Sequence, residues 1–152
     1  MRQFAVTLSV IAAVICLQPV VRADDAAEVK SAEVAFNDAQ NAGSTDGMFK
    51  YMLPERTVFG TSGDRLAEGW TEESKRVRQA AFDAGRKIDL KIQDFEVTVY
   101  GDAAVTTFYR IGTIKEVGGK PEQKRYRISG VWVRRNGQWK LAHRHESPLA
   151  AP

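Results

Sequence analysis

Cysteine is almost absent from this chain of 152 residues, in which Cys16 is the only one. A single cysteine excludes an intrachain disulfide, so the fold must be held together by burial of apolar side chains. Histidine is nearly as scarce, since His143 and His145 are the only two. Any role for histidine in this protein therefore depends on one His-x-His pair near the C-terminal end of the sequence.

The sequence also lacks an apolar run long enough to span a membrane. Residues 4–17 are nearly all apolar, but a spanning helix needs about 20 such residues. Arg2 precedes this run, and small residues stand at both recognition positions before Ala23, which is the pattern of a cleavable signal peptide. Cys16 follows Ile15 rather than a small residue, which argues against a lipoprotein. We expect residues 1–23 to be removed and the mature protein to be periplasmic or secreted, with no attachment to the membrane.

A strong excess of one charge is missing as well. Removal of residues 1–23 takes away two arginines and no acids, so that Lys and Arg fall from 22 to 20 against 19 Asp and Glu. A nucleic-acid-binding protein is usually more basic, and we expect no nucleic-acid partner. The basic residues between positions 115 and 144 are typical of solvated β-hairpins. Residues 24–152 have the length of a single domain.

Apolar residues first follow the period of a helix. Residues 26–42 form one predicted helix, and Thr45 can cap a short second helix that carries Met48, Phe49, Met52 and Leu53 and ends at Pro54. A short strand follows around Val58 and Phe59. Thr71 is a good N-cap for a third helix that runs to about Ala84, with an inner stripe formed by Val77, Ala80, Ala81 and Ala84.

After Gly85 the period changes to two, which predicts strands. Four strands follow, with a bulge near Asp94, a hairpin turn at Gly101-Asp102 and a two-residue turn at Asn136-Gly137. Helices followed by an antiparallel meander indicate an α+β architecture. A single curved sheet wrapped around helices would leave an open-ended cavity.

Several stretches of the sequence resemble a known family. They are Gly101-Asp102-Ala103-Ala104, Tyr109-Arg110, VWVRRNGQW at 131–139, HRHES at 143–147 and, more weakly, Glu68-Gly69-Trp70. The chain resembles the nuclear-transport-factor-2-like (SnoaL-like) superfamily, which includes ketosteroid isomerases and polyketide cyclases. It is most similar to the association domain of calcium/calmodulin-dependent protein kinase II and its bacterial relatives.

The resemblance implies a cone-shaped, cystatin-like α+β fold in which three N-terminal helices pack on a curved antiparallel sheet. It also implies a pocket between helices and sheet and a tendency to form a homodimer or a higher oligomer. It does not imply kinase activity, because the sequence contains no glycine-rich phosphate loop.

The resemblance also bears on the pocket. The association domains carry several arginines that can receive a small carboxylate, and Arg110 falls on one of those positions. The two other positions hold Gly130 and Glu146 in this chain. The missing arginines argue against carboxylate binding and favour an internal pair between Arg110 and Glu146, or a polar, neutral ligand.

The alternation of side chains along a strand gives a list of candidate site residues. We assign the charged residues Arg110, Arg144 and Glu146 to the cavity. The apolar and aromatic candidates for its walls are Met52, Phe59, Trp70, Phe108 and Trp132.

The two histidines would then lie on the opposite face of the last strand, together with Trp139 and Leu141. No third ligand shares that face, so we expect no metal site. A structural or subunit-interface role competes with a role as acid/base catalysts for His143 and His145.

The sequence is compatible with three functions. The first is an exported, self-associating protein that binds a small organic ligand without strong catalytic activity. The second is a SnoaL-like or ketosteroid-isomerase-like acid/base enzyme that acts without a cofactor on a small hydrophobic substrate. Asp64, Glu68, Tyr109 and Tyr126 could serve such an enzyme, but none stands in a motif. The third is a purely structural module for oligomerisation or partner binding.

Overall fold

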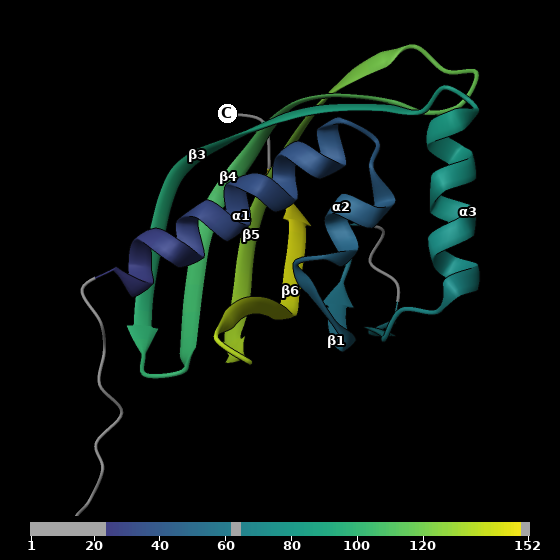
Figure 1. The fold of residues 1–152 in the computed structure, drawn as a ribbon. Helices are drawn as coiled ribbons and strands as arrows, with labels where there is room; N and C mark the ends of the chain where they lie inside the picture. The colour runs from purple at the N-terminus through teal and green to yellow at the C-terminus, as the bar shows by residue number, and fades with distance from the viewer. Residues whose placement is uncertain (1–23, 62–64, 150–152) are drawn as a thin grey trace, which may run out of the picture.

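The computed structural model describes residues 24–61 and 65–149, and the expected signal peptide lies outside these ranges. These described residues form helices and strands along the chain (Figure 1). They are α1 (Asp25–Asn41), α2 (Thr45–Phe49), β1 (Met52–Phe59), β2 (Ala67–Glu68), α3 (Glu72–Asp83), β3 (Lys87–Tyr100), β4 (Ala103–Lys115), β5 (Pro121–Arg135) and β6 (Gln138–Pro148). No helix among the described residues is long and apolar enough to cross a membrane.

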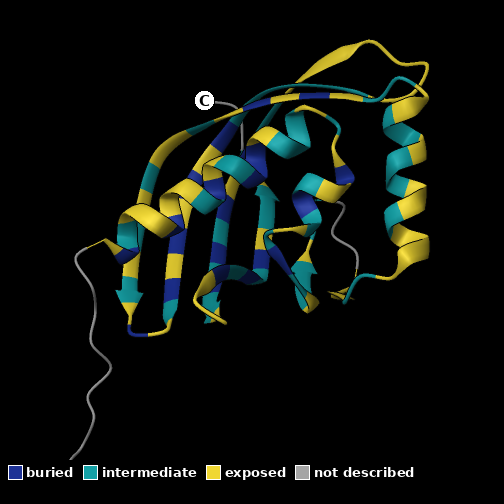
Figure 2. Ribbon diagram, in the orientation of Figure 1, coloured by how far each residue is buried: buried dark blue, intermediate teal, exposed yellow. Residues whose placement is uncertain are grey.

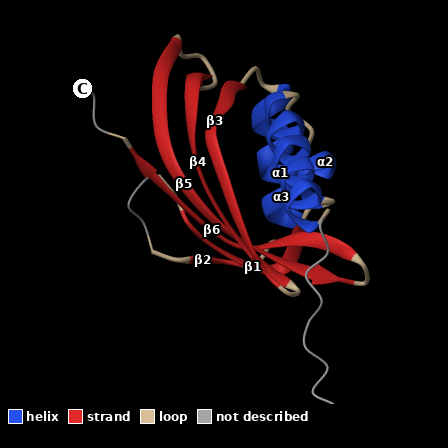
Figure 3. Cartoon of the chain, turned by 90° about the vertical axis from the view of Figure 1, so that its left-hand side faces the viewer, coloured by secondary structure: helices blue, strands red, loops and turns tan. Residues whose placement is uncertain are grey.

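The strands form one sheet in the order β2-β1-β6-β5-β4-β3. The sheet curves around the helices, which all lie on its concave side and leave the opposite face bare (Figure 3). This arrangement confirms the predicted α+β, cystatin-like fold class. One detail differs from the prediction, because β1 runs parallel to β6 and the sheet is therefore mixed.

The helix α1 supplies the main contact between the two layers. Val29 and Phe36 are buried at helical spacing and join a core with Met48, Met52, Trp132, Trp139 and Leu141. A second cluster of Ile88, Leu90, Phe108, Tyr126 and Ile128 lies further along the sheet. Buried residues alternate with exposed or intermediate ones along much of β4 and β5, as expected for a sheet with one covered face (Figure 2).

The second helix is shorter than predicted. It ends at Phe49, and Met52 and Leu53 belong to β1 instead. The Leu141 amide donates to the Tyr51 carbonyl oxygen over 2.7 Å, and Met52 is paired with Leu141 in the sheet. Strand pairing therefore outweighs the local helical pattern, and Pro54 favours the extended backbone before it.

The third helix begins as predicted but packs differently. Thr71 and Ser74 form a reciprocal capping box. The expected inner stripe is wrong, because Val77 is 60% exposed and no residue of α3 is buried. The helix stands beside the end of the sheet rather than across it (Figure 1), and the side chains that it turns inward are Lys75, Arg78, Gln79 and Phe82.

The sheet contains the predicted irregularities. The register of β3 against β4 shifts between Gln93 and Glu96, and Asp94 has a positive φ of 50°. Asn136 and Gly137 both have positive φ, as a two-residue hairpin turn requires. A further shift between β5 and β6 leaves Ala142 without a partner in the register, and this bulge decides which side chains of β6 face the helices.

Candidate functional site

A polar cavity of about 440 Å³ lies between the helices and the concave face of the sheet. Its wall combines apolar side chains from α1, α2 and the sheet with an unusual number of charged ones. The charged lining residues are Arg56, Arg78, Arg86, Arg110, Glu116, Lys124, Arg144 and Glu146. Six of these are basic and two are acidic, so the wall is cationic.

Arg110 on β4 forms the inner end of the cavity and is 1% exposed. Its Nε donates to Asn37 Oδ1 over 3.0 Å, and its Nη1 lies 3.6 Å from Glu146 Oε1. Its Nη2 is buried and has no hydrogen-bond partner among the described residues. Burial lowers the pKa of Arg110, and Glu146 opposes this shift.

Arg144 on β6 is fixed beside it and is 3% exposed. It forms an ion pair with Glu33, which is fully buried on α1, and its guanidinium lies 4.5 Å from the centre of the Phe36 ring. Glu33 also accepts a hydrogen bond from Trp132 Nε1 over 3.1 Å. Arg144 Nη1 is 3.8 Å from Glu146 Oε1, and its Nε has no partner within the described part of the chain.

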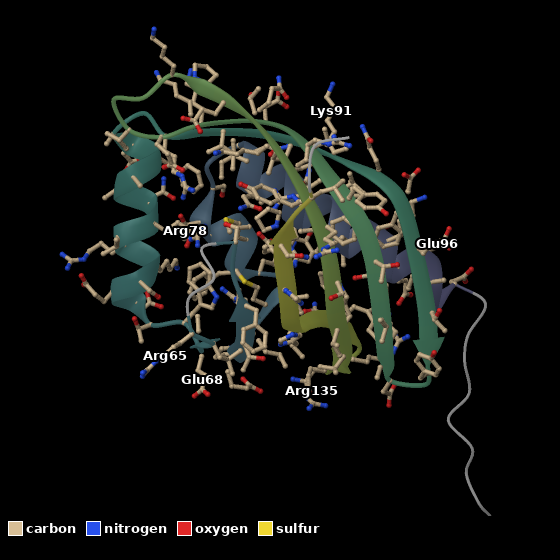
Figure 4. All side chains as sticks on the ribbon, turned by 180° about the vertical axis from the view of Figure 1, so that it is seen from behind. Arg65, Glu68, Arg78, Lys91, Glu96 and Arg135 are labelled. Carbon is tan, nitrogen blue, oxygen red and sulfur yellow. The ribbon has the colours of Figure 1, made fainter. Side chains whose placement is uncertain are left out.

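A second group of cations surrounds Trp70. The guanidinium carbons of Arg56 on β1 and Arg78 on α3 lie 4.5 and 5.0 Å from the centre of the indole ring. Phe49 packs against the same ring edge-on at 4.8 Å. Such cation–π contacts hold the arginines in place without neutralising their charge. Figure 4 shows Arg78 on the side of α3 that faces the rest of the domain, whereas Arg65 and Arg135 lie at the periphery.

Arg56 and Arg78 differ from the other lining cations because no carboxylate of the described residues lies within ion-pair distance of them. Arg86 pairs with Glu116 at 3.0 Å, Lys124 pairs with Glu122 at 2.7 Å, and Arg110 and Arg144 are matched by Glu146 and Glu33. Burial first, then repulsion from Arg144 and Arg78, lowers the pKa of Arg56 to about 9. Two positive charges without an ion-pair partner among the described residues therefore remain beside Trp70.

The structure separates the eight predicted pocket residues into three places. Arg110, Arg144, Glu146 and Trp70 line the cavity. Met52 and Trp132 belong to the main core, and Phe108 belongs to the second cluster. These three pack against residues of the cavity wall but do not line the cavity. Phe59 does not contribute to this cavity. It is 44% exposed and packs against His143 and His145, because β1 turns Val58 inward and Phe59 outward.

Both histidines point away from the cavity. The bulge at Ala142 reverses the alternation of β6, so that Trp139 and Leu141 face the helices whereas His143 and His145 face outward. The predicted shared face of these four residues is therefore wrong. His143 Nδ1 lies 2.7 Å from Thr57 Oγ1, and burial followed by repulsion from His145 lowers its pKa. Within the described ranges, no group of three metal-ligating side chains is present.

The acid/base groups considered from the sequence are dispersed. Tyr126 lines the cavity, and burial raises its pKa. Glu68 is exposed on β2, and Tyr109 is 37% exposed on the outer face of the sheet. Asp64 lies outside the described residues. Of the three groups that the structure describes, no two come together in an apolar cavity.

Sequence reasoning missed Arg56, Arg78 and Arg86 as pocket residues. Arg78 stands on α3 beside Lys75, Gln79 and Phe82, at the spacing of one helical face. A search for an apolar stripe overlooks a helix whose inner face is polar. Arg56 belongs to β1, whose start was misplaced. The signal that could have identified Arg56 was its alternation with Met52 and Val58 on a strand that begins earlier.

Comparisons with known proteins agree with this fold. A family model described as a SnoaL-like domain matches residues 29–151. No curated protein matches the chain.

Solved structures with the same fold include members with different names. A ketosteroid isomerase-like protein from Erwinia carotovora atroseptica has a TM-score of 0.70 at 18% identity and covers 86% of this chain and 100% of its own. The CaMKII hub of S. rosetta has a TM-score of 0.68 at 25% identity, covering 85% and 100%. The association domain of C. elegans CaMKII has a TM-score of 0.65 at 22% identity, covering 80% and 93%.

The family model confirms the resemblance that the sequence motifs indicate, and the solved structures agree with the fold. Because the family model spans most of the chain, the protein belongs to the SnoaL-like domain family.

Proposed function

We propose that this protein binds a small organic anion in the cavity between its helices and its sheet. The observation that carries the proposal is the pair Arg56 and Arg78, two partly buried guanidinium groups with no carboxylate partner among the described residues. A cation withdrawn from water is costly unless an opposite charge compensates it. An anionic ligand would supply that charge.

The arrangement of the donors supports an anion of limited size. Arg56 Nε and Trp70 Nε1 are buried without hydrogen-bond partners in the described ranges, and both belong to the cavity wall. A guanidinium presents a planar fork of donors that suits a carboxylate or a phosphate. A volume of about 440 Å³ lies in the range of small-molecule sites.

Binding without strong catalysis fits this cavity better than isomerase chemistry does. The ketosteroid-isomerase alternative needs a carboxylate base in an apolar cavity. The two lining carboxylates, Glu116 and Glu146, instead face arginines. The missing arginines at positions 130 and 146 argued against carboxylate binding. The cavity nevertheless contains other arginines, which come from β1, α3 and β6 and lie at positions outside the association-domain pattern.

Anion binding can be tested by calorimetric titration with acetate, succinate and inorganic phosphate, with neutral acetamide for comparison. We expect at least one anion to bind and acetamide not to bind. In the double variant R56Q/R78Q, the affinity should fall by about tenfold or more, because hydrogen bonds to charged groups are lost.

The control is R76Q, on the same helix, whose side chain is 77% exposed and pairs with Glu73. Thermal melting verifies that each variant folds. Equal binding by R56Q/R78Q and R76Q, with both variants folded, would refute the proposed site.

We also propose that the protein self-associates through the bare face of its sheet. Phe59, Val105 and Tyr109 are 44%, 41% and 37% exposed. Val105 and Tyr109 alternate with buried residues of β4, and Phe59 packs against the outward-facing histidines. Figure 3 shows that no helix covers this outer face of the sheet. Neighbouring structures with the names hub and association domain favour such assembly.

Sedimentation equilibrium at micromolar concentration tests the assembly. We expect a dimer or larger species in the wild type and a shift toward monomer in V105E. The matched control is V77E, which adds the same charge on α3, away from the sheet face. A monomeric wild type would contradict the proposal.

Export through residues 1–23 is a further part of the proposal. Sequencing of the mature N-terminus should find Asp24 first, and an uncleaved Met1 would contradict it.

A further inference from the structure

We infer that Glu146 selects amphoteric ligands, which carry an anionic group at one end and an ammonium group at the other. This inference rests on the proposed function, because it concerns the same cavity. It goes further because it assigns different chemistry to the two ends of that cavity. The end at Trp70 is expected to bind the anionic group, and the inner end at Arg110 is expected to bind the ammonium group. The basis is the distribution of charged side chains between these two ends.

The inner end of the cavity is already neutral. Arg144 is paired with buried Glu33, and the remaining charge of Arg110 is balanced by Glu146. A second anion placed there would meet a carboxylate. The anionic part of a ligand is therefore favoured at Arg56 and Arg78, whose two positive charges have no ion-pair partner among residues 24–61 and 65–149.

Glu146 is held near its arginines without forming a full hydrogen bond to either. Its Oε1 lies 3.6 Å from Arg110 Nη1 and 3.8 Å from Arg144 Nη1, distances at which a hydrogen bond is not formed. The structure gives it no hydrogen bond from any described side chain, and its side chain keeps 20% exposure on the wall of the cavity. Because no described side chain donates to it, Glu146 can accept hydrogen bonds from a donor on the ligand.

A partly buried carboxylate that accepts from no described side chain favours an ammonium group over a methyl group at the same position. The ammonium gains charge-assisted hydrogen bonds, whereas the methyl leaves the carboxylate unsatisfied. Glu146 attracts both Arg56 and Arg78 electrostatically. A ligand whose anionic group lies beside these two arginines can therefore reach Glu146 with its other end. Position 146 thus determines which carboxylates the cavity accepts.

The test is a calorimetric titration with two matched series of ligands, ω-amino carboxylates of increasing chain length and the corresponding unsubstituted fatty acids. We expect the wild type to bind at least one amino carboxylate about tenfold or more tightly than its unsubstituted counterpart. In E146Q this preference should disappear, while the affinity for the fatty acid should be unchanged or increased.

The matched control is E73Q, because Glu73 lies outside the cavity, where its exposed side chain pairs with Arg76. Its preference should equal that of the wild type, and thermal melting reports whether each variant is folded. Fatty acids that bind as tightly as amino carboxylates to the wild type would overturn this inference and leave the proposed anion site standing. If neither ligand series nor the simple anions bind to the wild type, both this inference and the proposed anion site are overturned.

Discussion

Glu33 is the residue that connects the core of the domain to its cavity. It is fully buried on α1, accepts from Trp132 Nε1 and holds the guanidinium of Arg144. Glu33 stabilises the fold through its negative charge. A neutral side chain at this position would leave the buried guanidinium of Arg144 without its closest carboxylate.

We therefore expect E33Q to lower the free energy of unfolding by about 3–5 kcal/mol, the usual cost of breaking a buried ion pair. Urea denaturation measures this change. The matched control is E28Q on the same helix, which weakens a half-exposed pair with Arg134 and should cost about 1 kcal/mol or less. Equal effects of the two substitutions would contradict the role assigned to Glu33.

His143 makes a prediction about pH. Burial lowers its pKa below the ordinary value of 6.5, so the folded protein favours the neutral ring. As the pH falls through 6.5, the unfolded chain takes up a proton before the folded chain does. The stability that His143 contributes is therefore complete above that pH and is lost as the pH falls toward the lowered pKa.

Urea denaturation between about pH 7 and pH 5 should show a smaller loss of stability in H143Q than in the wild type. The carboxylates titrate in both proteins, so the difference between the two profiles isolates this histidine. Identical profiles would show that His143 is not perturbed by burial.

Residue by residue, the sequence predicted the inward direction of Arg110, Arg144 and Glu146 but not the whole cavity. Alternation along a strand was enough for these three. It failed for Trp139 and Leu141, because the bulge at Ala142 reverses the alternation of side chains. No residue type at this position indicates the bulge in the sequence.

At the scale of elements, helix α3 shows why a cavity is harder to predict than a core. Its capping box made its start readable from Thr71. Its inner face carries Arg78 and Gln79, so a pattern that looks for buried apolar residues selected Val77 and the alanines instead. A helix that borders a polar cavity does not follow the rule for a helix that covers a core.

The long hairpin of β3 and β4 depends on Gly112. This residue has a φ of 155°, and a Cβ atom at its position would lie 2.0 Å from the Asp89 carbonyl oxygen. We expect G112A to lower the free energy of unfolding by about 2 kcal/mol or more, because the backbone must shift to relieve both strain and contact. The control G60A meets no atom within 4 Å and should be close to neutral in the same denaturation experiment.

At the scale of the whole molecule, the order of elements was largely readable from periodicity and turn residues. The parallel pairing of β1 with β6 was not, because it joins segments more than 80 residues apart and depends on the curvature of the sheet. That pairing brings Arg56 beside the cavity. The arginines that give the cavity its charge come from several elements, and only the assembled fold shows that they meet.

The central claim, that this cavity receives a small anion, is tested most directly by the indole N–H signals of the three tryptophans in a ¹H–¹⁵N spectrum. Trp70 Nε1 belongs to the cavity wall and has no partner in the described residues, whereas Trp132 Nε1 is bonded to Glu33 in the core. The variant W70F assigns the signal. Addition of the anions and amino carboxylates at millimolar concentration should shift the Trp70 signal and leave that of Trp132 in place. A Trp70 signal that stays fixed throughout the panel would contradict the account.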